Sequence, residues 1–465
     1  MAFAIIIALL VIGSVIFHAW SPWWLTPIAS NWGSIDTTID ITVWVTGFAF
    51  VVINLFLAYT VYKYRYSKKR RAEYEPENKK LEIWLTGITS VGVAALLAPG
   101  LFVWADFVNP PEEAHVVEVT GQQWQWAYRY PGADGKLGAA DPGLITEANP
   151  FGMKEDDPAG RDDILVESAI MHLPVDKPVK VVLRSKDVLH DFAVAEFRVK
   201  MDMVPGAVSY LWLTPTKTGT YDILCEELCG VGHFVMRGRV KVQEQADFDQ
   251  WLASQNTYED ALALARVDRA NGQATYAMCA GCHGVQGEGN PALNAPQIAG
   301  LQDWYVTAQL EHFKTGIRGG NPADTYGAQM IGLAAALPDS QTIRNLSAYI
   351  NSLPATQTKQ TLSGNLKNGK ELYDHNCSVC HGDNGRGVWS VHAPKLAGMD
   401  DWYLARQLRH FRDKVRGAHP EDDLGHQMQL MVSVLGDDQA INDVAVYISG
   451  LGYSDPSYVA ASKAN

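Results

Sequence analysis

Two long charge-free stretches near the N-terminus restrict this chain more than any other feature of its sequence. Residues 41–62 contain no charged side chain in 22 positions, and residues 83–105 contain none in 23. An apolar run of about 20 residues is long enough to cross a bilayer as an α-helix. A third run, at 2–17, lacks the basic start and the small-residue cleavage site of a signal peptide, which is the alternative for it. We therefore predict three transmembrane helices, at about 2–19, 41–62 and 83–105.

The charges between these helices predict the orientation of the chain. The loop 63–80 carries eight Lys and Arg residues, whereas the loop 21–37 carries none. Loops rich in Lys and Arg stay in the cytoplasm, so everything after residue 106 is expected on the periplasmic or outer face. We expect a multi-pass protein of a bacterial inner membrane. The formal net charge of −13 argues against nucleic acid as a partner, because binding nucleic acid needs a basic surface.

The hydrophobic pattern changes to period two over about residues 114–242. Runs such as "HVVEVTGQQWQWAYRY" and "KPVKVVLRSKDVLHDFAV" alternate and are separated by clusters of Gly, Pro and Asp. Alternation of this kind is typical of strands with one buried face. We predict a small antiparallel β-sandwich or barrel in this region. The acidic stretch 131–163, rich in Gly and Pro, interrupts the pattern, and we expect it to form a surface loop.

One short loop of this domain gathers potential metal ligands. "CEELCGVGHFVM" contains two cysteines, a histidine and a methionine, which are Cys225, Cys229, His233 and Met236. A disulfide is one alternative, and two buried thiols beside a core methionine are another. Methionine is a poor zinc ligand, whereas thiolates with a thioether favour copper. His190, in "DVLHDF" at the edge of an earlier strand, could add a second imidazole, so we predict a copper site.

The C-terminal part of the chain contains an internal repeat. "CAGCH" at 279 and "CSVCH" at 377 both match C-x-x-C-H, the pattern of c-type haem attachment. "APQIAG" and "DWY" in the first copy return as "APKLAG" and "DWY" at the same offset of 98 positions. A match that recurs with its surroundings indicates two tandem related domains. "DSQTIRNLSAYINSL" and "DDQAINDVAVYISGL" predict helices that begin after an aspartate cap.

Each repeat supplies its own haem ligands. Two thiols form the thioether bonds and the following histidine binds the iron, which predicts Cys279, Cys282, His283, Cys377, Cys380 and His381. "YGAQM" and "LGHQM" align Met330 with Met428, again 98 positions apart, so we expect these methionines as the sixth ligands. Core packing is the alternative for a methionine, and the aligned His312 and His410 are the alternative ligands. All six cysteines are then assigned.

The copper loop, "DVLHDFAV" and "GQQWQWAY" together resemble subunit II of the haem–copper respiratory oxidases, over about residues 38–242. The resemblance implies a binuclear copper centre, CuA, in which Cys225 and Cys229 bridge two copper ions. Its other ligands would be one imidazole for each ion and two weak outer donors, namely His190, His233, Met236 and the backbone carbonyl of Glu227. Bridging thiolates spread one electron over both ions, so little rearrangement accompanies reduction. The C-x-x-C-H repeats resemble class I cytochrome c domains.

The same resemblance implies roles for three further side chains. The Glu227 side chain would reach a Mg²⁺ ion at the interface with subunit I, with a simple hydrogen bond as the alternative. Trp124, the first Trp of "QWQW", would pass electrons to the copper centre, with a packed strand residue as the alternative. Glu82 would lie at the mouth of a proton channel. The family's motif is displaced here to "EIWLT", so a carboxylate favoured by the helix dipole is the alternative for Glu82.

We therefore expect a multidomain protein with N-terminal transmembrane α-helices, a cupredoxin-like β-sandwich and two α-helical cytochrome c domains. The predicted boundaries are 1–106 for the transmembrane helices, 107–245 for the CuA domain, 246–270 for a linker, 271–356 for the first cytochrome c domain and 357–456 for the second. The linker reads as a helical spacer that keeps the haems at high local concentration near the copper.

The resemblance implies the electron-input subunit of a cytochrome c oxidase. It would pass electrons through two covalent haems c and CuA to subunit I, which reduces O₂ to water and pumps protons. Its partners would be subunit I, subunit III, the membrane and an external donor such as a cytochrome c, a blue-copper protein or a donor complex. A CuA-containing nitric-oxide reductase and a membrane-anchored copper-binding protein are the alternatives. A quinol oxidase subunit is disfavoured because the copper ligands are present, and nitrous oxide reductase because of the anchoring helices.

Overall fold

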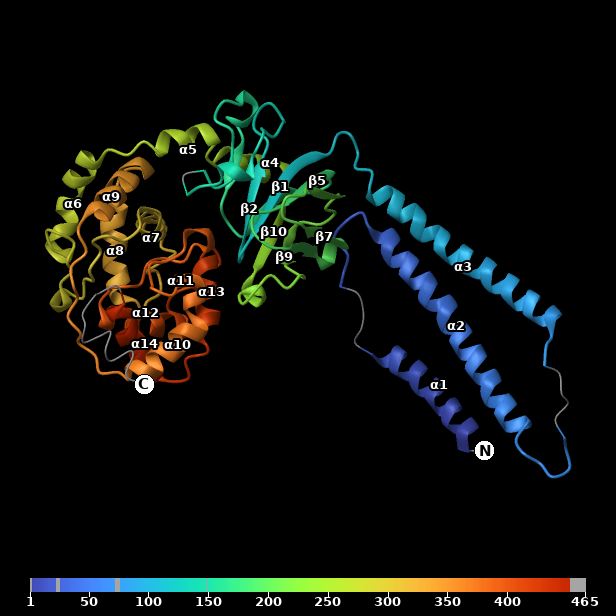
Figure 1. Cartoon of the computed structure of the whole chain (residues 1–465). Helices are drawn as coiled ribbons and strands as arrows, with labels where there is room; N and C mark the ends of the chain where they lie inside the picture. Colours follow the sequence, from blue (N-terminus) through green and yellow to red (C-terminus); the bar gives the residue numbers. More distant parts are fainter. Residues whose placement is uncertain (1, 22–25, 72–75, 148, 452–465) are drawn as a thin grey trace.

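The computed structural model describes residues 2–21, 26–71, 76–147 and 149–451. A β-sandwich lies in the middle, with long helices extending from one side and a curved helical part on the other (Figure 1). The predicted end of the second cytochrome c domain, at 456, lies outside the described residues. The remaining predicted boundaries are not tested by this arrangement and stay predictions.

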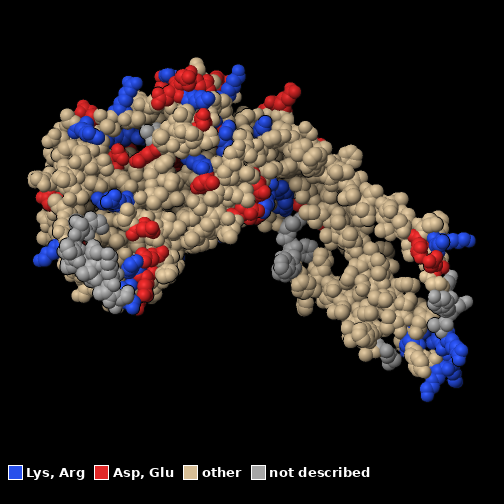
Figure 2. Space-filling model, in the orientation of Figure 1, with Lys and Arg blue, Asp and Glu red and all other residues tan. Residues whose placement is uncertain are grey.

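Three helices at the N-terminal end are long and apolar enough to cross a membrane: α1 (Ala2–Trp20), α2 (Gly33–Lys63) and α3 (Lys79–Phe107). The visible face of these helices is almost free of charge, and Lys and Arg gather at the tip beyond α2 (Figure 2). α2 begins at Gly33 rather than at 41, because the absence of charge marks the apolar span and not the end of the helix. Its polar first turns stay helical outside the apolar span, and Asp36 there accepts a hydrogen bond of 2.7 Å from Arg198 of the sandwich.

The sandwich consists of two five-stranded sheets, with the strand orders β3-β2-β1-β5-β8 and β4-β10-β9-β6-β7. Its strands are β1 (His115–Gln122), β2 (Gln125–Tyr130), β3 (Ile164–Val166), β4 (Ile170–Pro174), β5 (Val179–Ser185), β6 (His190–Val194), β7 (Val199–Met203), β8 (Ser209–Leu213), β9 (Gly219–Leu224) and β10 (Arg237–Gln243). β1 pairs with β5 and β4 with β10 in parallel, so the expectation of a purely antiparallel sandwich was wrong for these pairs. The chain changes sheets between β3 and β4 and again between β4 and β5, and strands brought together by such crossings need not be antiparallel.

The core between the sheets follows the alternation seen in the sequence. In β5, Val179, Val181 and Leu183 are fully buried, while the residues between them are half-buried. Phe192 of β6 meets the ring of Trp126 of β2 edge-on, with the centroids 5.9 Å apart. These contacts fix β6, which carries one of the predicted copper ligands, against the opposite sheet.

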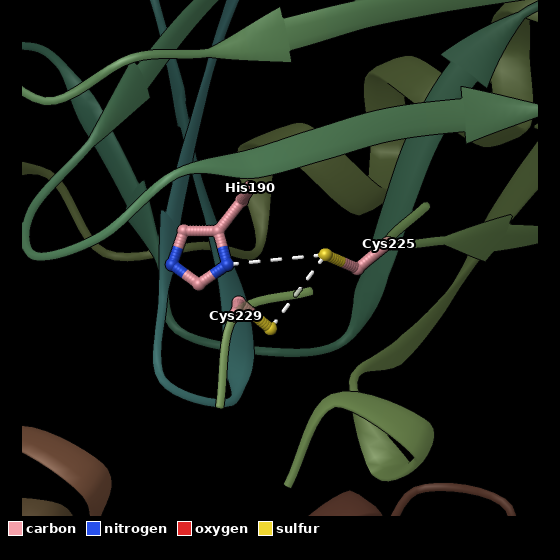
Figure 3. A group of neighbouring side chains, drawn as sticks. All are labelled: His190, Cys225 and Cys229. Atoms are coloured by element: carbon pink, nitrogen blue, oxygen red, sulfur yellow. Dashed lines mark hydrogen bonds between the residues drawn. The ribbon is translucent and has the colours of Figure 1, made fainter. Parts of the chain in front are cut away.

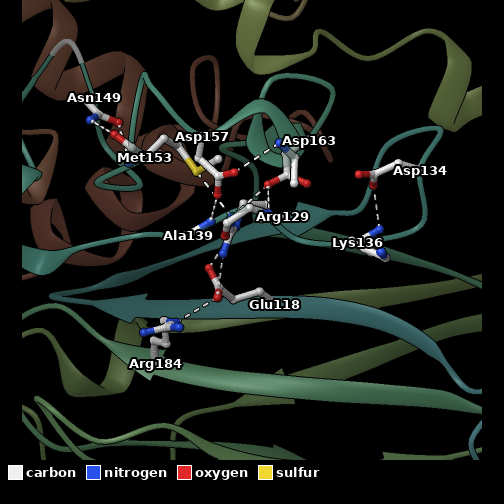
Figure 4. A network of polar contacts seen from close by, with 12 residues as sticks. Glu118, Arg129, Asp134, Lys136, Ala139, Asn149, Met153, Asp157, Asp163 and Arg184 are labelled. Carbon is white, nitrogen blue, oxygen red and sulfur yellow. Dashed lines mark hydrogen bonds and ion pairs between the residues drawn. The ribbon is translucent and has the colours of Figure 1, made fainter.

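The described parts of the stretch 131–163, residues 131–147 and 149–163, are held to the sandwich by a buried arginine (Figure 4). Arg129 is bound by Glu118 at 2.9 Å and by Asp163 at 2.8 Å, and it donates to the carbonyl of Gly138 at 2.7 Å. All three charged side chains are nearly inaccessible to solvent. Arg184 adds a second cation on Glu118, at 2.7 Å. The predicted surface loop therefore has a buried anchor at its base.

A linker and two helical domains follow the sandwich. The linker contains α4 (Gln245–Ala253) and α5 (Tyr258–Leu264), in agreement with a helical spacer. The first domain contains α6 (Arg269–His283), α7 (Asp303–Thr315), α8 (Thr325–Ala335) and α9 (Ser340–Ser352). The second contains α10 (Leu366–Asn376), α11 (Ser378–His381), α12 (Asp401–Arg412), α13 (Asp423–Val432) and α14 (Asp438–Gly450). Asp339 and Asp437 cap α9 and α14 through their side chains, as predicted.

The two domains differ at the haem-attachment helix. Tyr276 in α6 and Tyr373 in α10 are equivalent, since each donates a hydrogen bond to a glycine carbonyl just beyond its C-x-x-C-H sequence. They are 97 positions apart, whereas Cys279 and Cys377 are 98 apart, so the second copy has one extra residue between tyrosine and cysteine. The first domain keeps one continuous helix here, and the second breaks it into α10 and α11.

The two domains face each other through matching contacts. Arg318 of the first domain donates to Tyr403 of the second at 2.8 Å, and Arg416 of the second donates to Gln309 of the first at 2.9 Å. Arg318 is buried, and its guanidinium donates to oxygens of both Gln309 and Tyr403, which compensates the burial of its charge. The reciprocal pattern holds the two domains in a fixed relation.

Candidate metal and haem sites

The predicted copper ligands come from β6 and from the loop between β9 and β10. His190 is the first residue of β6 and is fully buried. β6 pairs with β9, and β9 pairs with β10. The joining loop ends in a short 3₁₀-helix, His233–Val235, just before β10. Ligands far apart in the sequence therefore meet because their strands are neighbours in one sheet.

His190 and the two cysteines point toward one another (Figure 3). The Sγ atoms of Cys225 and Cys229 are 3.7 Å apart, and Cys225 Sγ is 3.9 Å from His190 Nδ1. These three ligand atoms all lie within 4.8 Å of one another. The structure thus brings together residues that the sequence separates by 35 positions.

The remaining predicted ligands complete the cluster. Cys229 Sγ lies 3.5 Å from His233 Nδ1 and 3.7 Å from Met236 Sδ. Cys225 Sγ lies 3.2 Å from the carbonyl oxygen of Glu227. Each sulfur therefore has one imidazole nitrogen and one weaker donor beside it, and the two halves share the pair of sulfurs.

This donor set fits a binuclear copper centre. Both cysteines are free, which removes the disulfide alternative in this structure. The hydrogen bond between the two sulfurs lowers the pKa of Cys225 and raises that of Cys229, so without metal the pair shares one proton. Two soft sulfurs, a thioether and imidazoles match the preference of copper rather than that of zinc. Cys225, Cys229 and Met236 are buried, so the three sulfur ligands are shielded from water, whereas His233 is half-buried.

A second residue orients His190. Asp187 accepts a hydrogen bond from His190 Nε2 at 2.8 Å, so Nε2 carries the proton and Nδ1 presents its lone pair toward Cys225. The Asp187 carboxylate also accepts from the backbone N–H groups of Gln123 at 2.7 Å and Val188 at 2.7 Å. Carboxylates that hold a ligating histidine in this way tune both its orientation and its basicity.

Trp124 lies in the turn between β1 and β2 and packs against the copper loop. Its indole Nε1 donates to the carbonyl of Cys229 at 3.2 Å. Gly232 lies beside the ring so closely that an added Cβ would come within 2.3 Å of it. The ring is therefore in direct contact with the loop that carries the copper ligands, in a turn rather than in a strand.

The two predicted proximal histidines share one arrangement. His283 Nδ1 donates to the carbonyl of Pro296 at 2.8 Å, and His381 Nδ1 donates to that of Pro394 at 2.8 Å. Both rings are buried. A proton on Nδ1 leaves the Nε2 lone pair free for iron, which is the tautomer that a haem ligand needs. The residues present therefore fit haem c in both domains.

The predicted sixth ligands lie on matching helices, Met330 on α8 and Met428 on α13. Both are half-buried and pack against the common core of the two domains. A cavity of about 980 Å³ is lined by Cys380, His381 and Met428, so the structure brings together three of the residues predicted for the second haem.

Two predicted side chains are given no ligand or channel contact by the structure. Glu82 lies in the first turn of α3, and the side chain of Glu227 is half-buried beside the copper loop. Their roles in a proton channel and a Mg²⁺ site stay predictions.

Some residues that shape these sites were missed in the sequence. Asp187 stands three positions before His190 in "DVLH", but no repeat marks it. Pro296 and Pro394 belong to the repeated "AP" of "APQIAG" and "APKLAG", so the internal repeat could have identified them.

Comparison with known proteins identifies the families that these regions match. Residues 115–243 match the family described as cytochrome C oxidase subunit II, periplasmic domain, and residues 269–354 and 366–452 each match the cytochrome c family. An alternative cytochrome c oxidase subunit 2 of Bradyrhizobium diazoefficiens is 57% identical over 270 residues, which are 58% of this chain and 98% of that protein. The chain belongs to the cytochrome c oxidase subunit II family.

Further relatives extend the comparison. A cytochrome c oxidase subunit 2 of Cereibacter sphaeroides is 32% identical over 46% of this chain and 77% of that protein. One of Alkalihalophilus pseudofirmus is 26% identical over 66% of this chain and 83% of that protein. As a subunit II with cytochrome c domains, the chain serves electron transfer in a haem–copper oxidase. Its subunit II domain implies copper as CuA, and its cytochrome c domains imply haem c. The apolar helices anchor it to a membrane, with the subunit II domain on the periplasmic side.

Proposed function

We propose that this chain is the electron-input subunit of a terminal oxidase that reduces O₂ to water. It takes single electrons from an external donor through the two haem c domains and passes them through the copper site to subunit I. The observation that carries the proposal is the convergence of six donor atoms, the sulfurs of Cys225 and Cys229 and four atoms around them, with Trp124 packed against the same loop.

The arrangement of protein groups supports this role over that of a copper carrier. When bound, the copper pair accepts one electron with little change in geometry. The chain supports this by holding its ligands rigidly: His190 is fixed by Asp187, and the sulfurs are buried in the core of the sandwich. A carrier protein must release its ion, which calls for accessible ligands. Rigid, buried ligands favour electron transfer instead.

The proposed setting follows from the same placement. The chain crosses an inner membrane three times and places residues after 106 in the periplasm. Its partners are subunit I, subunit III and a soluble or membrane-bound one-electron donor. Glu227 reaches a Mg²⁺ ion at the contact with subunit I, and Glu82 lies at the start of a proton path. The predicted domain boundaries belong to this proposal as well.

The test is O₂ uptake by the purified membrane complex supplied with one reduced c-type donor. We expect rapid, cyanide-sensitive uptake, and we expect the Cys229→Ser complex to lose most of it while its haems still reduce. Cys282→Ser in the haem domain serves as a matched cysteine control, because it should leave the copper content unchanged. A wild-type complex whose haems and copper reduce without O₂ uptake would contradict the proposal and point to nitric oxide as the acceptor.

A further inference from the structure

The second cytochrome c domain is seated directly on the copper domain. Gln427 of α13 donates a hydrogen bond of 2.7 Å to the backbone carbonyl of Trp124. Asp423, at the start of the same helix, accepts from the backbone N–H of Ala169 at 3.1 Å and lies 3.3 Å from Arg239. α13 lies on the side of the helical part that faces the sandwich (Figure 1). We call this contact between α13 and the copper domain the seat. It includes Trp124, the residue proposed to receive electrons.

A second group of contacts comes from the segment after the haem-attachment sequence. Gln122 donates to the carbonyl of Ser390 at 2.9 Å, and Gln125 contacts the ring of His392. Glu167 of the sandwich lies 3.4 Å from His392. Cys380 itself packs against the hydrophobic core of the sandwich. The haem-bearing face of the second domain therefore lies toward Trp124.

One cavity lies where the copper domain meets both cytochrome domains, and the haem-ligand residues in its lining come from the second of them. Its lining includes Trp124, Gly232 and Val235 from the copper domain, and Cys380, His381 and Met428 from the second cytochrome domain. Trp124 is only 5% exposed, with the copper loop on one side and this cavity on the other. A soluble donor cannot reach the ring while the second domain is seated.

The first domain presents the equivalent face to solvent. The positions that line the cavity or make the seat in the second domain have counterparts 98 residues earlier. Cys380, Val391, Leu424 and Gln427 are half-buried, while their counterparts Cys282, Leu293, Tyr326 and Gln329 are all exposed. Leu293 is 50% exposed and Tyr326 is 40% exposed. One face of the repeat is therefore covered in one copy and open in the other.

We propose that electrons pass through the two haem domains in a fixed order, first domain to second domain to copper, with Trp124 between the last two. The proposal rests on the function proposed above. Each transfer moves one electron: an external one-electron redox protein loses it at the open face of the first domain. The second domain takes it across the Arg318 and Arg416 contacts and delivers it at Trp124 to the oxidised copper site. The second domain permanently occupies the surface that a soluble cytochrome would otherwise use.

A matched pair of ligand variants tests the order. Met330→His and Met428→His each replace a thioether with an imidazole, which lowers the potential of one haem. A redox titration of the full-length chain checks that each variant has shifted only its own haem. The oxidised complex is then mixed without O₂ with a reduced c-type donor, and haem and copper absorbance are followed together.

The order predicts two different results. In Met428→His the first haem should reduce at the wild-type rate while copper reduction is strongly slowed. In Met330→His reduction of all three centres should be slow, because the first acceptor is blocked. The reverse pattern, in which Met330→His leaves the other haem and the copper reducing normally, would overturn the proposed order. Failure of the wild-type copper to reduce at all would instead overturn the proposed function.

The seat itself is tested without electron transfer. Arg239→Glu places a like charge beside Asp423, and Thr325→Arg alters the counterpart of Asp423 on the open face as a control. Hydrogen–deuterium exchange of the full-length chain should rise about tenfold at Ala169, whose backbone N–H donates to Asp423, for Arg239→Glu, a change in opening of about 1.4 kcal/mol. It should stay unchanged for Thr325→Arg. Unchanged exchange in both variants would show that the second domain does not cover Trp124 in solution.

Discussion

Replacing Asp187 tests whether the copper site depends on the group that orients His190. Its carboxylate accepts three N–H groups, from Gln123, Val188 and His190. In Asp187→Asn, the one carbonyl oxygen can still accept from Val188 and His190, but the amide nitrogen must face the N–H of Gln123. This hydrogen bond is exposed, so water can replace the lost acceptor, and its loss should cost about 0.5–1.5 kcal/mol of folding stability with or without metal.

The effect on copper affinity is separate from this loss of stability. The imidazole of His190 keeps an acceptor in Asp187→Asn but loses the negative charge that strengthens its basicity. Loss of such an outer partner weakens metal binding by about 10–100-fold. We expect the lower end for Asp187→Asn and the upper end for Asp187→Ala, which removes all three acceptors. Tenfold corresponds to about 1.4 kcal/mol.

The assay is competition for copper between the full-length chain and a chelator of known affinity, with the melting temperature measured in parallel. Asp222→Asn is the matched control, because Asp222 is an exposed aspartate in β9 of the same sheet. It should leave copper affinity unchanged. Wild-type affinity in both Asp187 variants would refute the reasoning, since His190 would then be held without its carboxylate.

Three further predictions concern the sandwich. Gly232→Ala should lower the free energy of unfolding by about 1–3 kcal/mol and slow copper reduction, because the new Cβ would lie 2.3 Å from the Trp124 ring. Calorimetry measures the loss of stability. Gly436→Ala is the control and should show no such loss, because a Cβ at Gly436 meets nothing within 4 Å. Arg129→Ala should cost about 3–5 kcal/mol in denaturant unfolding, because Glu118 and Asp163 stay buried without a cation. Arg161→Ala, at an exposed pair of 3.9 Å, should cost about 0.5 kcal/mol or less, and equal losses would contradict the buried network. Burial lowers the pKa of His172 from 6.5 to about 4, so the unfolded chain binds more protons between these values and stability is lost as pH falls through this window. At pH 5 the loss is about 2 kcal/mol, and His172→Gln should remove it; a His172→Gln chain as acid-sensitive as the wild type would contradict this assignment.

Much of the site was predictable because its chemistry is local in the sequence. Four of the side chains predicted to bind copper lie within one loop, and the softness of these donors alone indicated copper. The internal repeat carried further information, since the offset of 98 positions aligned Met330 with Met428 on matching helices. The three long apolar helices followed from composition, although the start of α2 did not, because helical turns continue beyond the apolar span.

The rest depends on contacts that no local pattern records. The parallel pairing of β1 with β5 follows from the path of the chain between two sheets. The alternation of buried and exposed side chains does not reveal it, because this alternation is the same in parallel and antiparallel strands. Asp187 can orient His190 only after the fold has brought it beside Gln123 and the start of β6. The seating of α13 on Trp124 joins residues 303 positions apart and depends on how the linker helices place the domains. The sequence does contain a signal for the break between α10 and α11. Tyr373 stands four positions before its cysteine, whereas Tyr276 stands three positions before its own, so the second copy has one extra residue.

The central claim is that electrons reach copper through the haem c domains of this chain. Its most direct test is a single anaerobic mixing of the oxidised complex with a reduced one-electron donor, in which haem c and copper absorbance are recorded together. The account predicts that haem c reduces first and that copper reduction follows as haem c is reoxidised. Copper that reduces before haem c, or haem c that reduces while copper stays oxidised, would contradict it.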